Sequence, residues 1–296
     1  MRLDQTFISI RERDLLETFD LAILVTRQHL RNLLALLLLN ALPWALFDWL
    51  VLFQYAAGVD AEASGYLFYF QMTLLVVSQA SIGTALITGY LGQAMFVERQ
   101  TIGQTYRQFF RKPVLFGWVH GVVRLVVPIA ALLVLANLNI DSPAAGFCVF
   151  MAVLLIGVQG LIRAFRPFVN EVVMLEKTPY QRTADGRINF KTRMKALHQG
   201  AADFTGRSLA MLFFAPLLFF SLFGSFCLAD YYLLLQAGID FPLKTIYWSI
   251  ALWMVAGFAA VVRFLFYIDT RIRQEGWAIE LKMRAEGLRL SGQEAR

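Results

Sequence analysis

The sequence is poor in charge, since only 16% of its 296 residues are Asp, Glu, Lys or Arg. When glycine is added to the hydrophobic residues, about 65% of the chain is apolar, against ~45–50% in soluble domains. A soluble globule of this length cannot bury so much apolar surface, because its surface-to-volume ratio limits the size of the core. The composition therefore excludes an ordinary soluble domain and predicts an integral membrane protein.

Cysteine and histidine are also scarce. Cys148 and Cys227 are the only cysteines, and both lie in apolar runs. This excludes a disulfide-stapled secreted module and predicts two small buried residues. His29, His120 and His198 fall in separate segments, so the sequence predicts no metal site.

The motifs of nucleotide binding and hydrolysis are absent. The sequence has no Walker loop, no G-x-G-x-x-G, no G-x-S-x-G, no H-E-x-x-H and no C-x-x-C. We therefore predict no enzyme and no cofactor. An intramembrane enzyme stays open as an alternative, because catalytic groups can converge from different helices.

Long apolar runs are the main feature of the sequence. A helix needs about 20 apolar residues to cross ~30 Å of hydrocarbon, and this length predicts six spans. The predicted fold is all-α: six transmembrane helices form three consecutive hairpins with cytoplasmic amphipathic helices. An interfacial amphipathic segment at 1–31 and a cytoplasmic tail helix at 269–296 flank the transmembrane domain, 32–268. The predicted spans are 32–55, 66–96, 114–138, 146–165, 208–235 and 247–268.

Basic residues alternate between the predicted connections. The short loops 56–65 and 139–145 have no Lys or Arg, whereas the long loop 166–207 has eight. The positive-inside rule then places both termini in the cytoplasm. The net charge of +6 favours anionic lipid headgroups at this face and is not evidence for nucleic-acid binding.

The chain also contains an internal repeat. The related strings 26–31 and 106–111 precede the first and third spans, and Pro43, Pro128 and Pro216 lie near the middle of the outward-running spans. These features predict three parallel units, each a cytoplasmic amphipathic segment followed by a helical hairpin. The prolines have two interpretations, helix packing or a binding site at the membrane midplane.

Five ionisable residues fall inside the predicted spans, where such residues are costly and often functional. Arg163 and Arg263 lie near the cytoplasmic surface, where we expect them to snorkel, and we expect Asp230 to reach outer water or a headgroup. Asp48 and Arg124 lie deeper and form our candidate intramembrane polar pair. This pair either has a structural role or forms part of a substrate pathway.

Two cytoplasmic segments are candidate partner-docking surfaces. The tail helix 269–296 carries two apolar faces, one of them formed by Trp277, Leu281 and Leu288. A helix with two apolar faces can contact its own domain and a partner chain, or it lies partly in the membrane. The basic loop 166–207 is the second candidate, although a solvated basic loop has the same composition.

Two strings carry a family resemblance: Arg166-Pro167-Phe168 leading to the L-E-K-T-P of 175–179, and the D-x-R-x-R-x-E-G that begins at Asp269. The chain resembles uncharacterised bacterial six-span membrane proteins related to the membrane domain of glycerophosphoryl diester phosphodiesterases. The resemblance implies an accessory membrane component. It does not imply phosphodiesterase activity, because the catalytic barrel of the fused enzymes needs roughly 250 residues that this chain has no room for.

These observations lead to two hypotheses of function. The first is a non-enzymatic scaffold or accessory subunit of a membrane complex, based on the two-faced tail and the basic inner surface. The alternative is a small transporter or lipid-handling permease, based on the three prolines and on the depth of Arg124.

Overall fold

A computed structural model of the chain describes residues 13–56, 61–94, 102–109, 117–138, 145–176, 189–198, 202–234 and 241–275. Throughout these residues the secondary structure is helical, with no strand. The helices are α1 (Leu15–Ala56), α2 (Ala61–Gly83), α3 (Ala85–Ala94), α4 (Ile102–Phe109), the π-helix η2 (Gly117–Val123), α6 (Val126–Leu138), α7 (Ala145–Phe165), α8 (Val169–Glu171), the π-helix η3 (Val172–Glu176), α9 (Phe190–His198), α10 (Ala202–Leu234) and α11 (Phe241–Glu275).

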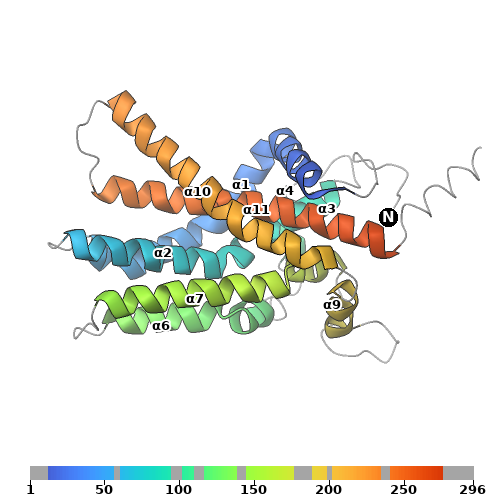
Figure 1. Cartoon of the computed structure of the whole chain (residues 1–296), viewed down its shortest axis with the longest axis horizontal. Helices are drawn as coiled ribbons and strands as arrows, with labels where there is room; N and C mark the ends of the chain where they lie inside the picture. Colours follow the sequence, from blue (N-terminus) through green and yellow to red (C-terminus); the bar gives the residue numbers. More distant parts are fainter. Residues whose placement is uncertain are drawn as a thin grey trace, which may run out of the picture.

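Helices α2, α6, α7 and α11 run along one common direction, and α10 crosses them obliquely (Figure 1). In this view α6 and α10 end at the left, where α7, α11 and α2 begin, whereas α9 and the end of α11 lie at the right. This arrangement agrees with consecutive hairpins that turn at one end of the bundle. The short helices α4 and α9 precede the second and third hairpins, where the repeat predicts amphipathic segments.

Four helical stretches are long and apolar enough to cross a membrane: Leu15–Leu52, Leu67–Ala94, Leu209–Tyr232 and Lys244–Gln274. A fifth is possible if the bent pair Val149–Phe165 and Val169–Glu176 forms one span. The predicted span 114–138 is not one continuous helix in the structure, because a break at Arg124 and Leu125 leaves only a short apolar helix after it.

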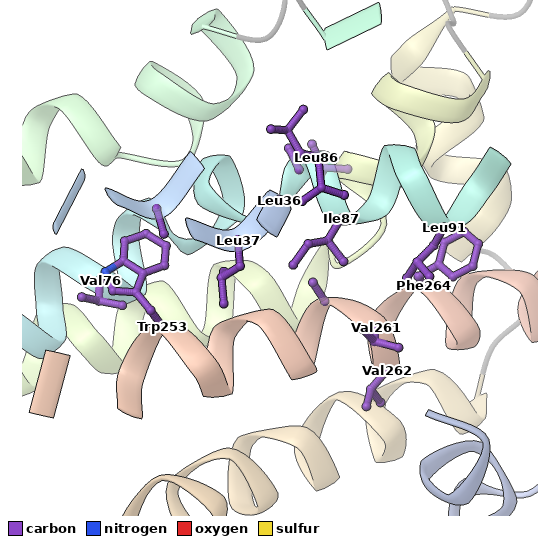
Figure 2. Close-up of a cluster of buried hydrophobic side chains, with 14 of the residues drawn as sticks. Leu36, Leu37, Val76, Leu86, Ile87, Leu91, Trp253, Val261, Val262 and Phe264 are labelled. Carbon is purple, nitrogen blue, oxygen red and sulfur yellow. The ribbon is translucent and has the colours of Figure 1, made fainter. Parts of the chain in front are cut away.

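The core of the bundle lies between α1, α2, α3 and α11. Leu36 and Leu37 of α1 approach Ile87 of α3 and the face of α11 that carries Val261 (Figure 2). The most apolar window of α2 is 89% buried, whereas that of α10 is only 6% buried. The second helix is therefore central, and α10 packs at the periphery with most of its apolar surface uncovered.

The first helix joins the predicted amphipathic segment to the predicted first span, which we separated at residue 31. It continues from Leu15 to Ala56, with a non-helical conformation at His29 (φ −107°, ψ 15°). Phe19 is buried against the bundle, but Leu16 and Leu24 are exposed. The amphipathic segment thus presents apolar side chains outward, as a helix at a membrane surface does.

Candidate site at three helix breaks

A helix break positions Arg124 inside the bundle. The ring of Pro128 removes the N–H that would bond to the carbonyl of Arg124, and it clashes with that carbonyl in a regular helix. The chain adapts with a positive φ of 59° at Leu125. The freed Arg124 carbonyl accepts a 2.9 Å hydrogen bond from Gln159 Nε2 of α7. By contrast, α1 and α10 continue across Pro43 and Pro216.

A second break separates α2 from α3 at Thr84, and side chains from other helices bond to the carbonyls around it. The carbonyl of Ser81 accepts a 2.8 Å hydrogen bond from Asn170 Nδ2, and that of Ile82 accepts a 2.7 Å hydrogen bond from Asn40 Nδ2 of α1. Both side chains are buried, so this turn of α2 is held from two sides.

The third break follows α7, where the chain bends by 56° into residues 169–176. The carbonyl of Arg166 at this bend accepts a 2.8 Å hydrogen bond from Arg124 Nη2. Arg163, one turn earlier, donates a 3.0 Å hydrogen bond to the carbonyl of Ser78 in α2. Hydrogen bonds therefore connect all three breaks into one polar network.

This network contains three arginines and one carboxylate. Arg263 Nε of α11 lies 2.8 Å from Glu171 Oε1, and Glu171 has no exposed surface. Arg124, which is 3% exposed, belongs to the same network through its hydrogen bond to the carbonyl of Arg166, five residues before Glu171. We call Arg124, Arg163, Arg263 and Glu171 the arginine cluster. Its formal charge is positive by two when all four groups are ionised.

Several buried polar atoms of this region have no hydrogen-bond partner among the described residues. They include the donors Arg163 Nε and Ser81 Oγ and the acceptor Glu171 Oε2. A buried donor without a partner costs about 1–3 kcal/mol, so such atoms usually mark bound water or a ligand. The network thus leaves several of its buried side-chain atoms without a hydrogen-bond partner.

The predicted pair of Asp48 and Arg124 does not form in the described part of the chain. Asp48 Oδ1 accepts a 2.7 Å hydrogen bond from Gln79 Nε2 of α2, whereas Arg124 donates to the Arg166 carbonyl. The expectation of an ion pair is therefore wrong. It assumed a regular third span, and the break after Arg124 turns its side chain toward the bend that follows α7.

The other ionisable residues also turn inward. Arg163 and Arg263 bond to Ser78 and Glu171, although both side chains stay partly exposed. Asp230 is 3% exposed and accepts a 3.2 Å hydrogen bond from Tyr247 of α11. The prediction that Asp230 reaches water or a headgroup is therefore wrong, because a partner on α11 is within reach.

Glu171 and Asn170 are the site residues that the sequence analysis missed. Both lie in the loop that we assigned to the cytoplasm, yet both are fully buried. A polar pair between the apolar runs 168–169 and 172–175 was the available signal. In the structure this segment forms α8 and the π-helix η3, and its polar pair is buried in the bundle.

Two further ionic groups tie the ends of the helices together. Glu176 receives two hydrogen bonds from Arg193 of α9, at 2.6 and 2.8 Å, and one from the Tyr267 hydroxyl at 2.7 Å. Asp269 accepts hydrogen bonds from Arg207 at 2.5 Å and from Arg273 at 3.0 Å. Arg193 and Arg207, two basic residues of the predicted docking loop, thus also hold the bundle together.

The candidate docking residues Trp277, Leu281 and Leu288 lie outside the described residues, as does most of the tail 269–296. Helix α11 continues without a break from the predicted sixth span to Glu275, so the tail begins as an extension of this span. Asp269 and Arg273, two residues of the D-x-R-x-R-x-E-G string, form an ion pair within it.

An apolar groove lies apart from the polar network, between α1, α3, α10 and α11. It has a volume of about 220 Å³, and its lining includes Leu33, Leu37, Leu218, Met254 and Phe258. Apart from the hydroxyl of Thr26, its lining side chains are apolar, so the groove suits hydrocarbon. The part of the chain that the structure describes contains no group of three or more His, Cys, Asp or Glu side chains that could hold a metal ion.

Comparisons with protein-family models, with curated proteins and with solved structures found no match to this chain. The resemblance to membrane domains of glycerophosphoryl diester phosphodiesterases accordingly stays a prediction.

Proposed function

We propose that the chain is a six-span protein of the bacterial cytoplasmic membrane that acts as a small permease or lipid-handling transporter for an anionic compound. The observation that carries the proposal is the arginine cluster, in which three arginines and one buried carboxylate belong to a single hydrogen-bonded network. An uncompensated charge in the interior costs several kcal/mol. A site that closes around an anion accounts for the excess positive charge of the cluster. A polar core with a purely structural role does not require this charge.

The helix breaks support the same proposal. Irregular backbone at membrane depth is found where it is buried in protein or lines a polar pathway, and many transporters build their binding sites from broken helices. Here the breaks at Thr84, at Leu125 and after Phe165 join in one network with Arg263 of α11. A membrane helix that serves only as a scaffold has no requirement for such breaks.

The proposed orientation places the cluster toward the cytoplasm. Arg163 lies 18 residues after the start of α7, or about 27 Å along the helix, and Arg263 lies about 33 Å after the start of α11. With outer ends at Ala145 and Phe241, both arginines lie near the inner boundary of a ~30 Å hydrocarbon layer. The proposed site is then closed in this conformation but close to cytoplasmic water.

The apolar groove favours the lipid-handling form of the proposal, because its lining suits an acyl chain. The scaffold or accessory-subunit hypothesis, with partners bound through 166–207 and 269–296, stays a prediction, as does binding of anionic headgroups by the basic face. The scaffold hypothesis depends mainly on residues 276–296, which lie outside the described part of the chain.

The proposal is tested by the reactivity of a cysteine at Ser81. Ser81 has no exposed surface, so a thiol at this position reacts only if the site opens to water. In a background with Cys148 and Cys227 replaced by alanine, Ser81→Cys is treated with an anionic methanethiosulfonate in right-side-out and inverted membrane vesicles. A permease must open the site, and we expect modification from at least one side.

The control is Ala85→Cys, one turn later, which is equally buried but lies in the hydrophobic core. We expect this thiol to stay unmodified. If Ser81→Cys is as inert as Ala85→Cys from both sides, the polar network is a sealed structural core and the permease proposal fails. Single cysteines in 56–65, 139–145 and 236–246 test the six-span topology, since all three must react only from outside.

A further inference from the structure

We infer that the arginine cluster binds a phosphate group with two negative charges, such as the terminal phosphate of a monoester. This inference deepens the proposed function and depends on it, since it names the ligand class of the same site. The phosphate group has two sources, a soluble phosphate compound or a lipid with a phosphomonoester headgroup. The chemistry that the site recognises is the same for both.

The charge of the cluster selects a divalent anion. Arg124, Arg163 and Arg263 contribute three positive charges, and Glu171 removes one. A phosphate monoester carries about −1.5 to −2 at neutral pH and compensates this excess. A carboxylate or a phosphodiester carries one negative charge and leaves one positive charge uncompensated in the interior. A neutral ligand leaves both positive charges uncompensated, and a cation adds to them.

The origin of the three guanidinium groups suits a tetrahedral ligand. Arg124 lies at the break before α6, Arg163 on the last turn of α7 and Arg263 on α11, so the donors come from three separate segments. The terminal oxygens of a phosphate point in different directions, and each accepts hydrogen bonds from a guanidinium edge. A planar carboxylate offers only two oxygens and suits a single arginine.

Two donors at one turn of α2 are available for the first contacts. Arg163 uses Nη2 to bond to the Ser78 carbonyl, but its buried Nε has no partner among the described residues. Ser81 lies one turn after Ser78, and its buried hydroxyl has no partner there either. Phosphate oxygens that accept from these groups satisfy donors that otherwise stay buried and unbonded.

The direct test is equilibrium binding of radiolabelled inorganic phosphate to the purified full chain in detergent, at constant ionic strength. We expect saturable binding of one phosphate per chain. Arg163→Gln removes a charge-assisted hydrogen bond and weakens this binding about tenfold or more. Ser81→Ala, which removes only a hydroxyl and preserves the fold, weakens it several-fold.

Arg166→Gln is the matched control. It removes an arginine only three residues from Arg163, but this side chain is exposed, and the carbonyl that binds Arg124 is unchanged. We expect the phosphate affinity of Arg166→Gln to equal that of the wild-type chain. If Arg166→Gln weakens binding as much as Arg163→Gln does, general surface charge explains the binding and the inference is wrong.

Lipid nanodiscs distinguish the two sources. If the ligand is a lipid headgroup, nanodiscs with phosphatidic acid raise the melting temperature of the wild-type chain above that in phosphatidylglycerol, and Arg163→Gln abolishes the difference. If the ligand is soluble, inorganic phosphate binds in detergent and the two lipids are equivalent. Absence of phosphate binding together with equal melting temperatures in both lipids overturns the inference.

The outcomes also separate this inference from the proposed function. If Ser81→Cys reacts with the anionic reagent but neither phosphate source binds, the site opens to water and takes another ligand. If phosphate binds but Ser81→Cys never reacts from either side, the phosphate is a structural component and the chain is not a permease.

Discussion

Arg263 Nε lies 2.8 Å from Glu171 Oε1, which joins the central helix α11 to the bend that follows α7. Glu171 is fully buried, and Arg263 also donates a 3.3 Å hydrogen bond to Thr88 of α3. This ion pair therefore connects three elements at the point where two helices are broken. It also sets the charge of the arginine cluster, because Glu171 is the single carboxylate among the four residues that define it.

The pair predicts a strong asymmetry between single and double substitutions. Glu171→Gln leaves Arg263 in the interior without its carboxylate, and we expect a loss of about 3–5 kcal/mol in unfolding free energy. Arg263→Gln has a similar cost. The double variant Glu171→Gln/Arg263→Gln recovers part of the loss, which thermal unfolding in nanodiscs measures. If the losses in unfolding free energy of the two single variants add up in the double variant, Glu171 and Arg263 do not interact directly.

Asp269 is predicted to hold the N-terminal segment to the end of the bundle. It accepts hydrogen bonds from Arg207, from Arg273 and from the backbone N–H of Arg13. Asp269→Asn removes the charge that pairs these groups, so we expect faster hydrogen exchange at 13–20 and 202–210, with a global loss of about 1–3 kcal/mol.

The exposed carboxylate Asp20 provides the comparison for Asp269. Asp20→Asn removes the same charge from α1, and we expect hydrogen exchange in both segments to stay at the wild-type rate. Equal protection in the Asp269 and Asp20 variants means that the N-terminal segment is held by packing alone.

Gly83 is predicted to tolerate no side chain. A Cβ at this position would overlap the ring of Trp253, which is itself buried in the core. Gly83→Ala therefore lowers the unfolding free energy by about 1–3 kcal/mol, and Trp253→Leu in the same chain restores part of it. Gly157→Ala in α7 is the control, because a Cβ there meets nothing within 4 Å. Equal melting temperatures for the two alanine variants contradict the close approach of α2 and α11.

Pro128 is predicted to maintain the break that positions Arg124. Pro128→Ala restores an N–H that can bond to the Arg124 carbonyl, in competition with Gln159. We expect the helix to straighten and the phosphate affinity of the cluster to fall. Pro43→Ala, in a helix that continues across its proline, leaves the affinity unchanged. The affinities come from the phosphate-binding measurement, and a normal affinity in Pro128→Ala shows that the break is not required.

The sequence predicts more of the fold than of the site. Long apolar runs identify the helical membrane class, and the spacing of Arg163 and Arg263 marks two related positions. Their partners could not be predicted, because they lie on segments far apart in the chain that meet only when the bundle packs. Pro128 signals a possible break, but Pro43 and Pro216 carry the same signal in helices that stay continuous. Neighbouring side chains decide which proline breaks its helix, and a single sequence does not reveal them.

The central claim is that a water-accessible phosphate site lies at the three helix breaks. The most direct test is the rate at which the anionic methanethiosulfonate modifies Ser81→Cys with and without inorganic phosphate, in chains with and without Arg163→Gln. The account predicts that phosphate slows modification several-fold when Arg163 is present and has no effect in Arg163→Gln. A rate that phosphate leaves unchanged in the chain with all three arginines would contradict it.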